Sequence, residues 1–367
     1  MSITTDKPRA TAPRFHALRV REITRETPDA VSVSFEVPPE LAADYAFAAG
    51  QYLTLRMTLD GEELRRSYSI CTAPGDGDLR IAVKQLPGGR VSGWVNAALK
   101  PGDWLDVMTP TGRFGLAHAP GNGRQHVAFA AGSGITPVLS IARDVLMREP
   151  GSHFTLFYGN RVTESILFRT ALEELKDRYL ARFAVFHVLS REQQDLSALN
   201  GHLNAEKIRD LLATVGGAAK IDHAFVCGPE AMIDEVGTAL RDAGLAEERL
   251  HTERFVSALG GRPRAAPVVD EAAPPAHIAT LIVDGKTRDV PVAAGEAVLD
   301  AALRAGLDLP FACKGGMCST CRAKVVEGAV EMALNYALEP WETEAGFVLT
   351  CQAQCTTPRV TIDYDHI

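Results

Sequence analysis

The segment FACKGGMCSTCRAKV, residues 311–325, decides the fold of the C-terminal part of this chain. It places Cys313, Cys318 and Cys321 in the spacing C-x4-C-x2-C, and a fourth cysteine, Cys351, follows after a long gap. This is the ligand spacing of a plant-type [2Fe–2S] cluster. One tight loop supplies three thiolates and the end of an apolar strand supplies the fourth. The sequence therefore predicts a cluster that carries one electron at a time.

Two other uses of these cysteines are less consistent with the pattern. A zinc site usually pairs two C-x2-C knuckles, and only one is present. Disulfides are not expected, because the N-terminus lacks the apolar core of a signal peptide. Gly315 and Gly316 would let the backbone fold around a cluster. Cys355, four residues after Cys351, is the one plausible alternative ligand.

Composition restricts the partners of the chain. Its 367 residues suffice for two or three domains, and 46% apolar with 23% charged residues is an ordinary globular balance. The net charge of −8 and the lack of a basic run argue against a nucleic-acid partner. No apolar run reaches the length of a membrane span, so we expect no membrane insertion and a cytoplasmic location. Residues 278–367 carry 12 acidic and 7 basic residues, which would suit a basic partner surface or simply a solvated one.

The first segment, residues 1–122, reads as a small antiparallel β-barrel. Short β-branched and aromatic runs are separated by Gly, Pro and Asp turns. The expected strands are Phe15–Ile23, Val31–Val37, Tyr52–Leu59, Arg66–Ile70, Leu79–Lys84 and Trp104–Val107. One helix is expected over Val91–Leu99.

The second segment, residues 123–256, alternates strands and helices, which predicts a doubly wound parallel α/β sheet. The expected strands are His126–Ala130, Phe154–Tyr158, Phe183–Leu189 and Ala224–Cys227, and the expected helices are Thr136–Met147, Arg169–Arg178, Ala205–Ala213 and Glu230–Ala243.

Residues 257–277, rich in Pro, Ala and Gly, are expected to form a semi-extended linker. Residues 278–367 then read as an α+β module, with strands Ile278–Val283 and Thr287–Val292, a helix Ala297–Ala305, the cysteine loop and closing strands.

Two motifs in the barrel segment are suited to a flavin nucleotide. Arg66 and Tyr68 alternate onto one face of a strand, where a guanidinium can hold a phosphate and an aromatic ring can pack on a flat ligand. Gly88-Gly89-Arg90-Val91-Ser92 leads into a helix, whose N-terminus favours phosphate. Each motif also has an explanation without a ligand. Arg66 and Tyr68 could be a surface arginine beside a tyrosine that packs on the core, and residues 88–92 could be a turn whose helix is capped by Ser92.

Two motifs in the α/β segment are suited to a pyridine nucleotide. Residues 132–137, GSGITP, follow the first strand as a pyrophosphate cradle would, although Pro137 replaces the last glycine of the usual fingerprint. Ser190 and Arg191 end the third strand, where a hydroxyl and a guanidinium suit a ribose 2′-phosphate and hence NADPH over NADH. Glu192, next to them, argues in the other direction.

Cys227-Gly228-Pro229 ends the fourth strand of that segment. A small thiol followed by glycine lets a flat ring come close. A buried core cysteine before a Gly-Pro turn explains the same residues equally well.

Taken in order, RSYS (66–69), GGRVS (88–92), GSGITP (132–137), SR (190–191) and CGP (227–229) resemble the motifs of the ferredoxin–NADP⁺ reductase family. The C-terminal cysteine module resembles plant-type ferredoxins, which have a β-grasp fold. The order of the three domains resembles the reductase components of multicomponent oxygenases, and the cluster loop in particular resembles those that serve a di-iron oxygenase.

The resemblance implies roles for the individual positions. Ser69, near flavin N5, and Cys227, near the nicotinamide C4, would orient the reacting groups rather than act as nucleophiles. The implied FAD-binding residues are Arg66, Tyr68, Ser69, Val83, Lys84, Gly89, Val91 and Ser92. The implied NADPH-binding residues are Gly132, Gly134, Thr136, Pro137, Arg161, Ser190, Arg191, Gly228 and Pro229. The implied cluster ligands are Cys313, Cys318, Cys321 and Cys351. Phe255 resembles an aromatic residue that covers the flavin in relatives, although here the chain continues beyond it.

The expected function is therefore electron transfer from NADPH through FAD and a [2Fe–2S] cluster to a di-iron oxygenase complex. A reductase for a Rieske-type or another aromatic hydroxylase is one alternative. A cluster-based redox-sensing module is another, although it has no need for two nucleotide sites.

Overall fold

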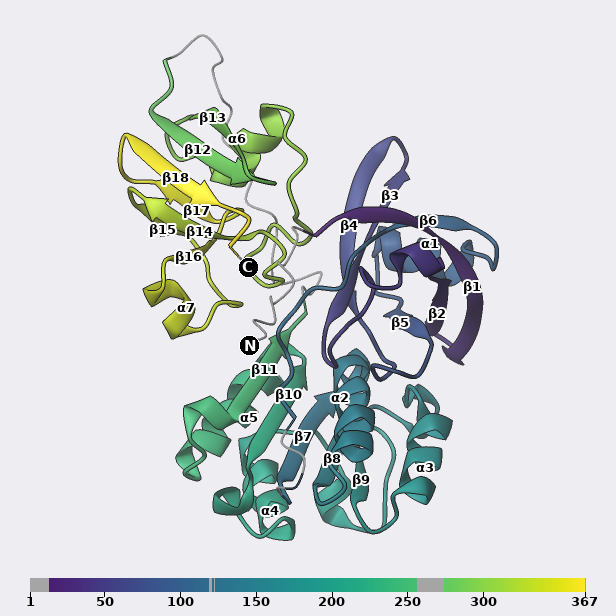
Figure 1. The fold of residues 1–367 in the computed structure, drawn as a ribbon. Helices are drawn as coiled ribbons and strands as arrows, with labels where there is room; N and C mark the ends of the chain where they lie inside the picture. Colours follow the sequence, from purple (N-terminus) through teal and green to yellow (C-terminus); the bar gives the residue numbers. More distant parts are fainter. Residues whose placement is uncertain (1–12, 119–120, 122, 256–273, 367) are drawn as a thin grey trace, which may run out of the picture. The chain divides into compact units, whose positions relative to one another are not determined.

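The computed structural model describes residues 13–118, 121, 123–255 and 274–366 (Figure 1). The chain divides into two compact units, Phe15–Ala258 and the C-terminal residues from Leu259, to which the N-terminal residues as far as Arg14 are assigned. Most of the expected linker, residues 257–277, lies outside the described residues.

The first part of the Phe15–Ala258 unit is an antiparallel barrel. Its strands are β1 (Phe15–Thr27), β2 (Ala30–Glu36), β3 (Tyr52–Leu59), β4 (Glu62–Ser69), β5 (Leu79–Lys84) and β6 (Trp104–Met108), with a short helix η1 (Pro39–Leu41). The strand order is β4-β3-β6-β1-β2-β5, and a bridge between Ile70 and Ile81 brings the two ends of the sheet together. Alternate residues such as Leu53 and Leu55 are fully buried inside it.

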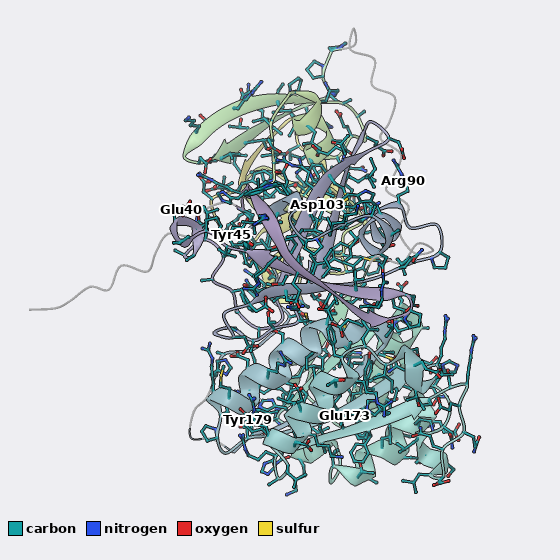
Figure 2. The ribbon with its side chains drawn as sticks, turned by 90° about the vertical axis from the view of Figure 1, so that its right-hand side faces the viewer. Glu40, Tyr45, Arg90, Asp103, Glu173 and Tyr179 are labelled. Atoms are coloured by element: carbon teal, nitrogen blue, oxygen red, sulfur yellow. The ribbon has the colours of Figure 1, made fainter. Side chains whose placement is uncertain are left out.

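Helix α1 (Arg90–Ala97) lies beside this barrel. Its first residue, Arg90, is labelled in Figure 2 and donates hydrogen bonds to Leu59 O at 2.9 Å and to Glu62 at 2.5 Å. These contacts tie the start of the helix to the hairpin of β3 and β4.

The second part of this unit is a five-stranded parallel sheet with the order β11-β10-β7-β8-β9. The strands are β7 (Gln125–Ala131), β8 (His153–Asn160), β9 (Phe183–Leu189), β10 (His223–Gly228) and β11 (Leu250–Arg254). The helices are α2 (Ile135–Arg148), α3 (Arg169–Arg178), α4 (Ala205–Thr214) and α5 (Glu230–Asp242). Short 3₁₀ turns are η2 (Gly132–Gly134), η3 (Thr163–Ser165), η4 (Ser197–Leu199), η5 (Ala218–Lys220) and η6 (Glu247–Arg249).

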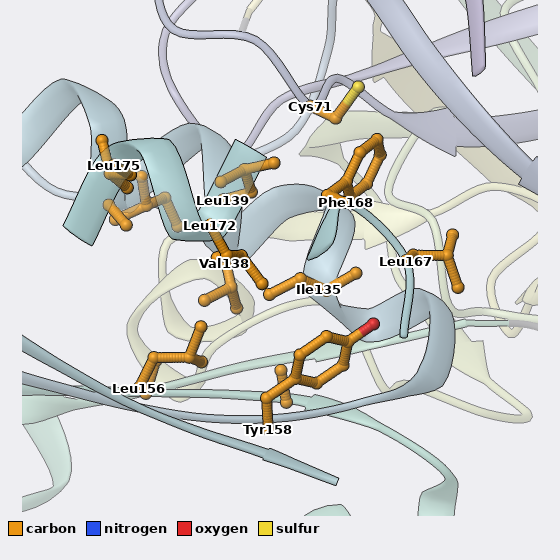
Figure 3. Close-up of a cluster of buried hydrophobic side chains, with 14 of the residues drawn as sticks. Cys71, Ile135, Val138, Leu139, Leu156, Tyr158, Leu167, Phe168, Leu172 and Leu175 are labelled. Carbon is orange, nitrogen blue, oxygen red and sulfur yellow. The ribbon is translucent and has the colours of Figure 1, made fainter. Parts of the chain in front are cut away.

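Strand alternation gives the parallel sheet two apolar faces. Ala128 of β7 faces a core built with α2 and α3, whereas Phe129 faces a second core built with α4 and α5. The first core also contains Cys71 and Phe114 of the barrel, and Figure 3 shows Cys71 beside Phe168. The barrel and the parallel sheet therefore share one apolar core.

Polar contacts strengthen this junction. The buried Ser140 of α2 donates a hydrogen bond to Thr72 O at 2.6 Å, and Arg143 lies 3.5 Å from Asp76. Both contacts join the first helix of the α/β part to the segment after β4. The carboxyl ends of the parallel strands are thus held in a fixed relation to the barrel.

The C-terminal unit has a five-stranded mixed sheet with the order β13-β12-β18-β14-β16. Strands β12 and β18 are parallel, the other pairs are antiparallel, and α6 packs on the sheet, which is the β-grasp arrangement. Its strands are β12 (His277–Val283), β13 (Lys286–Val292), β14 (Arg322–Glu327), β15 (Val330–Met332), β16 (Phe347–Leu349), β17 (Ala353–Cys355) and β18 (Arg359–Asp363), and its helices are α6 (Val298–Arg304) and α7 (Pro340–Glu344). The cysteine loop runs from α6 to β14.

The fold class expected from the sequence is confirmed, with differences at element level. Strand β1 continues to Thr27, beyond the expected end at Ile23, because its charged second half pairs with β2 and has a solvent-facing side. Strand β4 begins at Glu62 rather than Arg66, again through a charged stretch that hairpin pairing with β3 keeps extended. Strand β11 was not expected. In the described parts of the chain, no helix is long and apolar enough to cross a membrane.

Candidate functional site

The cysteine loop of the C-terminal unit has an unusually constrained backbone. Lys314 (φ 50°), Gly316 (φ 76°) and Ser319 (φ 49°) all lie in the left-handed region, which non-glycine residues rarely adopt. A Cβ at Gly316 would come within 3.0 Å of Leu334 O. Both the positive φ and this lack of space therefore favour glycine at the position. These turns direct the backbone around the space that the thiols face.

Hydrogen-bond donors converge on the sulfur atoms of this loop. The Gly315 N–H donates to Cys313 Sγ at 3.3 Å, and the Thr320 hydroxyl donates to Cys318 Sγ at 3.2 Å. A hydrogen bond from the Cys318 thiol, helped by backbone N–H groups, lowers the pKa of Cys313 to about 6. Such donors stabilise thiolates, the form in which cysteine binds iron.

The fourth cysteine is held against the loop by both of its neighbours. The buried Thr350 donates from its hydroxyl to Cys321 O at 2.9 Å, and Gln352 Nε2 donates to Lys314 O at 2.9 Å. The hydrogen bond between Cys351 and Cys321 lowers the pKa of Cys351. Cys355 lies on β17 opposite Val330, where burial raises its pKa.

The four thiols form two hydrogen-bonded pairs, Cys313 with Cys318 and Cys321 with Cys351. A [2Fe–2S] cluster takes two thiolates on each iron, so two neighbouring pairs fit its needs. Among the described residues, no group of three or more His, Cys, Asp or Glu side chains is arranged around one metal ion.

The expected flavin residues of β4 lie where alternation predicts. Arg66 is exposed, and Tyr68, two positions on, is partly buried against the barrel core, which raises its pKa. Ser69, on the next position, is buried. An exposed guanidinium next to an apolar aromatic surface fits a ligand with a diphosphate and a flat ring.

The second expected phosphate element is a tight turn before α1. Gly88 has φ 70°, and a Cβ at Gly89 would fall 2.4 Å from Ser92 Oγ. The Ser92 hydroxyl accepts from the Leu86 N–H at 3.1 Å, so it shapes the turn from inside. Val83 and Val91 are buried in the barrel core, and Lys84 forms an ion pair with Asp29 at 3.5 Å.

The glycine loop after β7 approaches the end of β10 very closely. Gly132 has φ 53°, and a Cβ at Gly134 would lie 2.1 Å from Cys227 O. Thr136 Oγ1 donates to Ser133 O at 2.9 Å, and Pro137 lies in the first turn of α2. The loop therefore needs Gly134, and its helix N-terminus lies at the strand ends where nucleotides bind.

A partly buried carboxyl group that sequence reasoning missed, that of Glu253, lies next to the two expected orienting residues. Ser69 Oγ donates to Glu253 at 3.1 Å, and Glu253 of β11 is in register with Cys227 of β10. Burial raises the pKa of Glu253 to about 8, and burial also raises the pKa of Cys227. Phe255, two residues further on, packs against the shared core.

Next to Cys227, Gly228 has little room for a side chain. A Cβ there would meet Met232 Cε at 2.8 Å and Ala131 Cβ at 3.2 Å. Pro229 then begins the turn into α5 with an extended backbone. These two residues bring the start of α5 close to the glycine loop.

The expected 2′-phosphate residues lie at the carboxyl ends of β8 and β9. The Arg191 N–H donates to Arg161 O at 2.8 Å, so the two residues are neighbours across adjacent strands, and both side chains are exposed. The carboxylate of Glu192 accepts hydrogen bonds from the Thr163 N–H and hydroxyl, each at 2.7 Å.

Comparisons with known proteins agree with this arrangement. Three family models match: the oxidoreductase FAD-binding domain over residues 17–115, the oxidoreductase NAD-binding domain over 129–238 and the 2Fe-2S iron-sulfur cluster binding domain over 281–356.

Full-length relatives are also found. One of the subunits of 1,2-phenylacetyl-CoA epoxidase from Escherichia coli is 44% identical over 96% of this chain and 98% of the relative. The ferredoxin reductase component of 3-ketosteroid-9-alpha-monooxygenase from Rhodococcus rhodochrous is 34% identical over 95% of this chain and 96% of the relative. Phthalate dioxygenase reductase has the same fold, with a TM-score of 0.57 and 22% identity over 95% of this chain and 98% of that structure.

Proposed function

This chain belongs to the family of oxygenase reductase components with FAD-binding, NAD-binding and [2Fe–2S] domains, and from that premise we propose its partner and its donor. It passes electrons from NADPH through FAD and the cluster to a di-iron oxygenase, specifically a phenylacetyl-CoA 1,2-epoxidase in aerobic phenylacetate degradation. The 44% identity to one of the subunits of such an epoxidase supports this partner. We place this activity in the cytoplasm, where cluster-ligating thiols stay reduced.

The single observation that carries the electron-transfer role is the constrained cysteine loop, in which backbone and hydroxyl donors converge on the cysteine sulfurs. The other unit contains the proposed FAD and NADPH sites. One chain would therefore hold both the electron-accepting nucleotide sites and the cluster that passes electrons on. We assign residues 1–122 to FAD, 123–256 to NADPH, 257–277 to a linker and 278–367 to the cluster.

The chemistry supplied by a bound FAD would be acceptance of a hydride and release of single electrons, which would match a two-electron donor to a one-electron cluster. The role of the protein is to position the two nucleotides and to place polar groups beside them. Ser69 and Glu253 place a hydroxyl and a partly buried carboxyl at the junction of barrel and sheet, where they would orient and protonate the flavin edge. Gly134 and Gly228 keep side chains away from the strand ends, and so leave room for the nicotinamide.

The clamp for the NADPH 2′-phosphate consists of Ser190 and Arg191, with Arg161 beside them. Guanidinium groups hold phosphate bidentately, and two of them are exposed at adjacent strand ends. This arrangement favours a phosphorylated ribose over a plain one.

A reductase for another oxygenase is the second candidate, and the ketosteroid monooxygenase relative is the observation that favours it. The redox-sensor alternative predicts no turnover of NADPH with an artificial acceptor, so that assay separates it from both reductase candidates.

Reconstitution tests the proposed partner. The purified chain is combined with the oxygenase subunits of a phenylacetyl-CoA epoxidase, and NADPH oxidation is followed with and without phenylacetyl-CoA. We expect substrate-dependent NADPH oxidation and formation of the epoxide. Reduction of ferricyanide without any transfer to these subunits would show that the chain serves another oxygenase.

A further inference from the structure

An acidic side chain stands at the edge of the expected 2′-phosphate clamp. Glu192 directly follows Ser190 and Arg191 after β9. In sheets of this kind, a carboxylate near this point accepts hydrogen bonds from the ribose 2′-hydroxyl and so selects NADH. A free Glu192 would also repel a 2′-phosphate. The sequence alone therefore gives opposing signals about the donor.

The structure shows where this carboxylate is directed. Both oxygens of Glu192 are used by one residue, because the Thr163 N–H donates to Oε2 and the Thr163 hydroxyl to Oε1, each at 2.7 Å. These hydrogen bonds lower the pKa of Glu192, so it is held there as a carboxylate. Thr163 is the first residue of η3, and the carboxylate thus caps that turn.

The neighbouring cations remain available. Arg161 and Arg191 are both exposed, and within the described part of the chain neither guanidinium forms an ion pair. Glu192 therefore neutralises neither of them. The positive charge of Arg161 and Arg191 remains available to a phosphate only while Glu192 is hydrogen-bonded to Thr163.

We propose that Thr163 is a specificity-determining residue, which holds Glu192 away from the ribose site and so sets the preference for NADPH over NADH. This inference rests on the proposed 2′-phosphate clamp. Thr163 acts through Glu192 and is a positioning residue rather than a catalytic one.

Replacing Thr163 by proline removes both donors in one step. The residue before it, Val162, has φ −143° and ψ 166°, the extended conformation that proline requires of its predecessor, and proline is favoured at the first position of a helical turn. T163P is therefore compatible with the local backbone. T163S keeps both donors and is the matched control. E192Q removes the charge in either background.

The measurement is kcat/KM for NADPH and for NADH with ferricyanide as acceptor, on the flavin- and cluster-loaded protein. In T163P we expect the NADPH-to-NADH ratio to fall about tenfold, which corresponds to about 1.4 kcal/mol. The change falls on KM, because the freed carboxylate repels the 2′-phosphate and binds the ribose hydroxyls. The kcat at saturating NADPH stays unchanged. T163S keeps the original ratio, and T163P combined with E192Q restores it.

Two results would overturn the inference. One is an equal loss for both nucleotides in T163P, which would mean that η3 has only a structural role. The other is an increase of the ratio in the single variant E192Q, which would mean that Glu192 already repels the phosphate. Failure of the underlying clamp gives a different signature, since the unmodified protein would then show no preference for NADPH and Arg191→Ala would leave the ratio unchanged.

Discussion

At the scale of single residues, we propose that Cys313, Cys318, Cys321 and Cys351 hold the cluster. Cys351→Ser removes one of two thiolates from one iron, so we expect the visible absorption of the cluster to be lost or strongly reduced after purification. Cys355→Ser, at a buried cysteine four residues away, is the matched control and keeps that absorption. Iron and sulfide analysis of the two purified variants measures how much cluster each one holds. A cluster that disappears in C355S and survives in C351S would reassign the fourth ligand.

Glu253 predicts a pH dependence of flavin reduction. Desolvation raises its pKa to about 8, so at neutral pH it carries a proton that it can donate to Ser69 Oγ, which would leave the Ser69 hydroxyl proton for the flavin. Above that pKa the carboxylate takes the hydrogen bond of Ser69 for itself. We expect the stopped-flow rate of reduction by NADPH to fall as the pH rises through about 8.

Two variants test this explanation. Glu253→Gln keeps a hydrogen-bonding group that does not titrate, and we expect a flat rate profile between pH 7 and 9. Ser69→Ala should lower the rate at every pH by tenfold or more, in line with the size of positioning effects. An unchanged inflection near pH 8 in E253Q would assign the titration to another group.

Only part of the site could be predicted from the sequence, because some of its residues interact with partners that lie far away along the chain. The cysteine spacing is local, and so are the glycine turns, so they could be found without a structure. Glu253 lies in the short polar stretch LHTER, and its partner Ser69 is 184 residues away. No local pattern connects them. The hydrogen bonds of Glu192 to Thr163 were hidden for the same reason.

At the scale of elements, the closest approach is that of the glycine loop to β10. Gly134→Ala would place a Cβ 2.1 Å from Cys227 O, and backbone atoms cannot move aside as a flexible side chain can. We expect the variant to lose about 1–3 kcal/mol of stability and to bind NADPH more weakly. Gly217→Ala tests a glycine with open space but a positive φ, and so measures backbone strain alone. Equal effects on nucleotide binding in both variants would contradict a role for this close approach.

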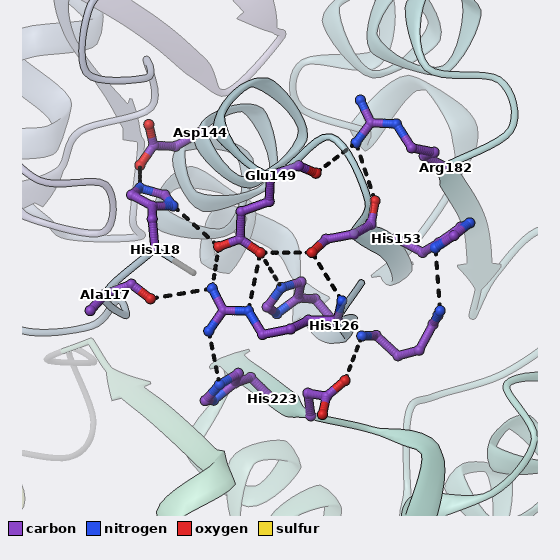
Figure 4. A network of polar contacts seen from close by, with 12 residues as sticks. Ala117, His118, His126, Asp144, Glu149, His153, Arg182 and His223 are labelled. Carbon is purple, nitrogen blue, oxygen red and sulfur yellow. Dashed lines mark hydrogen bonds and ion pairs between the residues drawn. The ribbon is translucent and has the colours of Figure 1, made fainter. Parts of the chain in front are cut away.

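The opposite, amino-terminal edge of the parallel sheet carries a buried polar network, shown in Figure 4. Glu149 accepts hydrogen bonds from Arg124 and from Ser152, the latter at 2.7 Å, and lies 3.3 Å from His126. Burial opposes ionisation of Glu149, but these donors prevail and bring its pKa to about 2. Burial lowers the pKa of His126, and likewise of His251, to about 4.

These histidines predict that the Phe15–Ala258 unit loses stability in mild acid. A histidine with a lowered pKa stays neutral in the folded state, whereas the unfolded chain takes up a proton below about pH 6.5. Stability is therefore present above pH 6.5 and is lost as the pH falls toward 4. Between pH 7.5 and pH 5 we expect a loss of about 2 kcal/mol from His126.

Urea unfolding followed by circular dichroism at pH 7.5 and pH 5 measures this loss. His126→Gln keeps a neutral hydrogen-bonding side chain near Glu149 and should show a smaller difference between the two pH values. Lys220→Gln, on the exposed turn η5, is the surface control. A difference that is the same in H126Q as in the unmodified chain would exclude this histidine as the cause.

Element prediction succeeded where apolar periodicity was strong. The core strands β7 to β10 and the helices α2 to α5 were all expected, because buried runs and amphipathic stretches identify them. Strand β11 and helix α7 were not expected, and strands β15 and β17 fall among the closing strands that were expected without bounds. All four of these elements are short and largely polar, so no apolar pattern marks them in the sequence. Their secondary structure depends on pairing with neighbouring strands or on contact with the rest of the cluster module.

At the scale of the whole molecule, the two compact units predict separate unfolding steps. The proline- and alanine-rich stretch 257–277 lies between them in the sequence. From its composition we expect a tether that lets the cluster module reach both the flavin and the oxygenase. Shortening it by ten residues should slow epoxidase-coupled NADPH oxidation while ferricyanide reduction is maintained. Unchanged coupling would show that no such reach is needed.

We propose that electrons pass from NADPH to the flavin and then to a four-cysteine cluster within this one chain. The most direct test adds NADPH anaerobically to the purified protein and follows flavin and cluster absorption, with NADH as comparison. We expect both chromophores to bleach, and to bleach faster with NADPH than with NADH. Bleaching of the flavin with no cluster signal would contradict the assignment of the four cysteines, and with it the role as an oxygenase reductase.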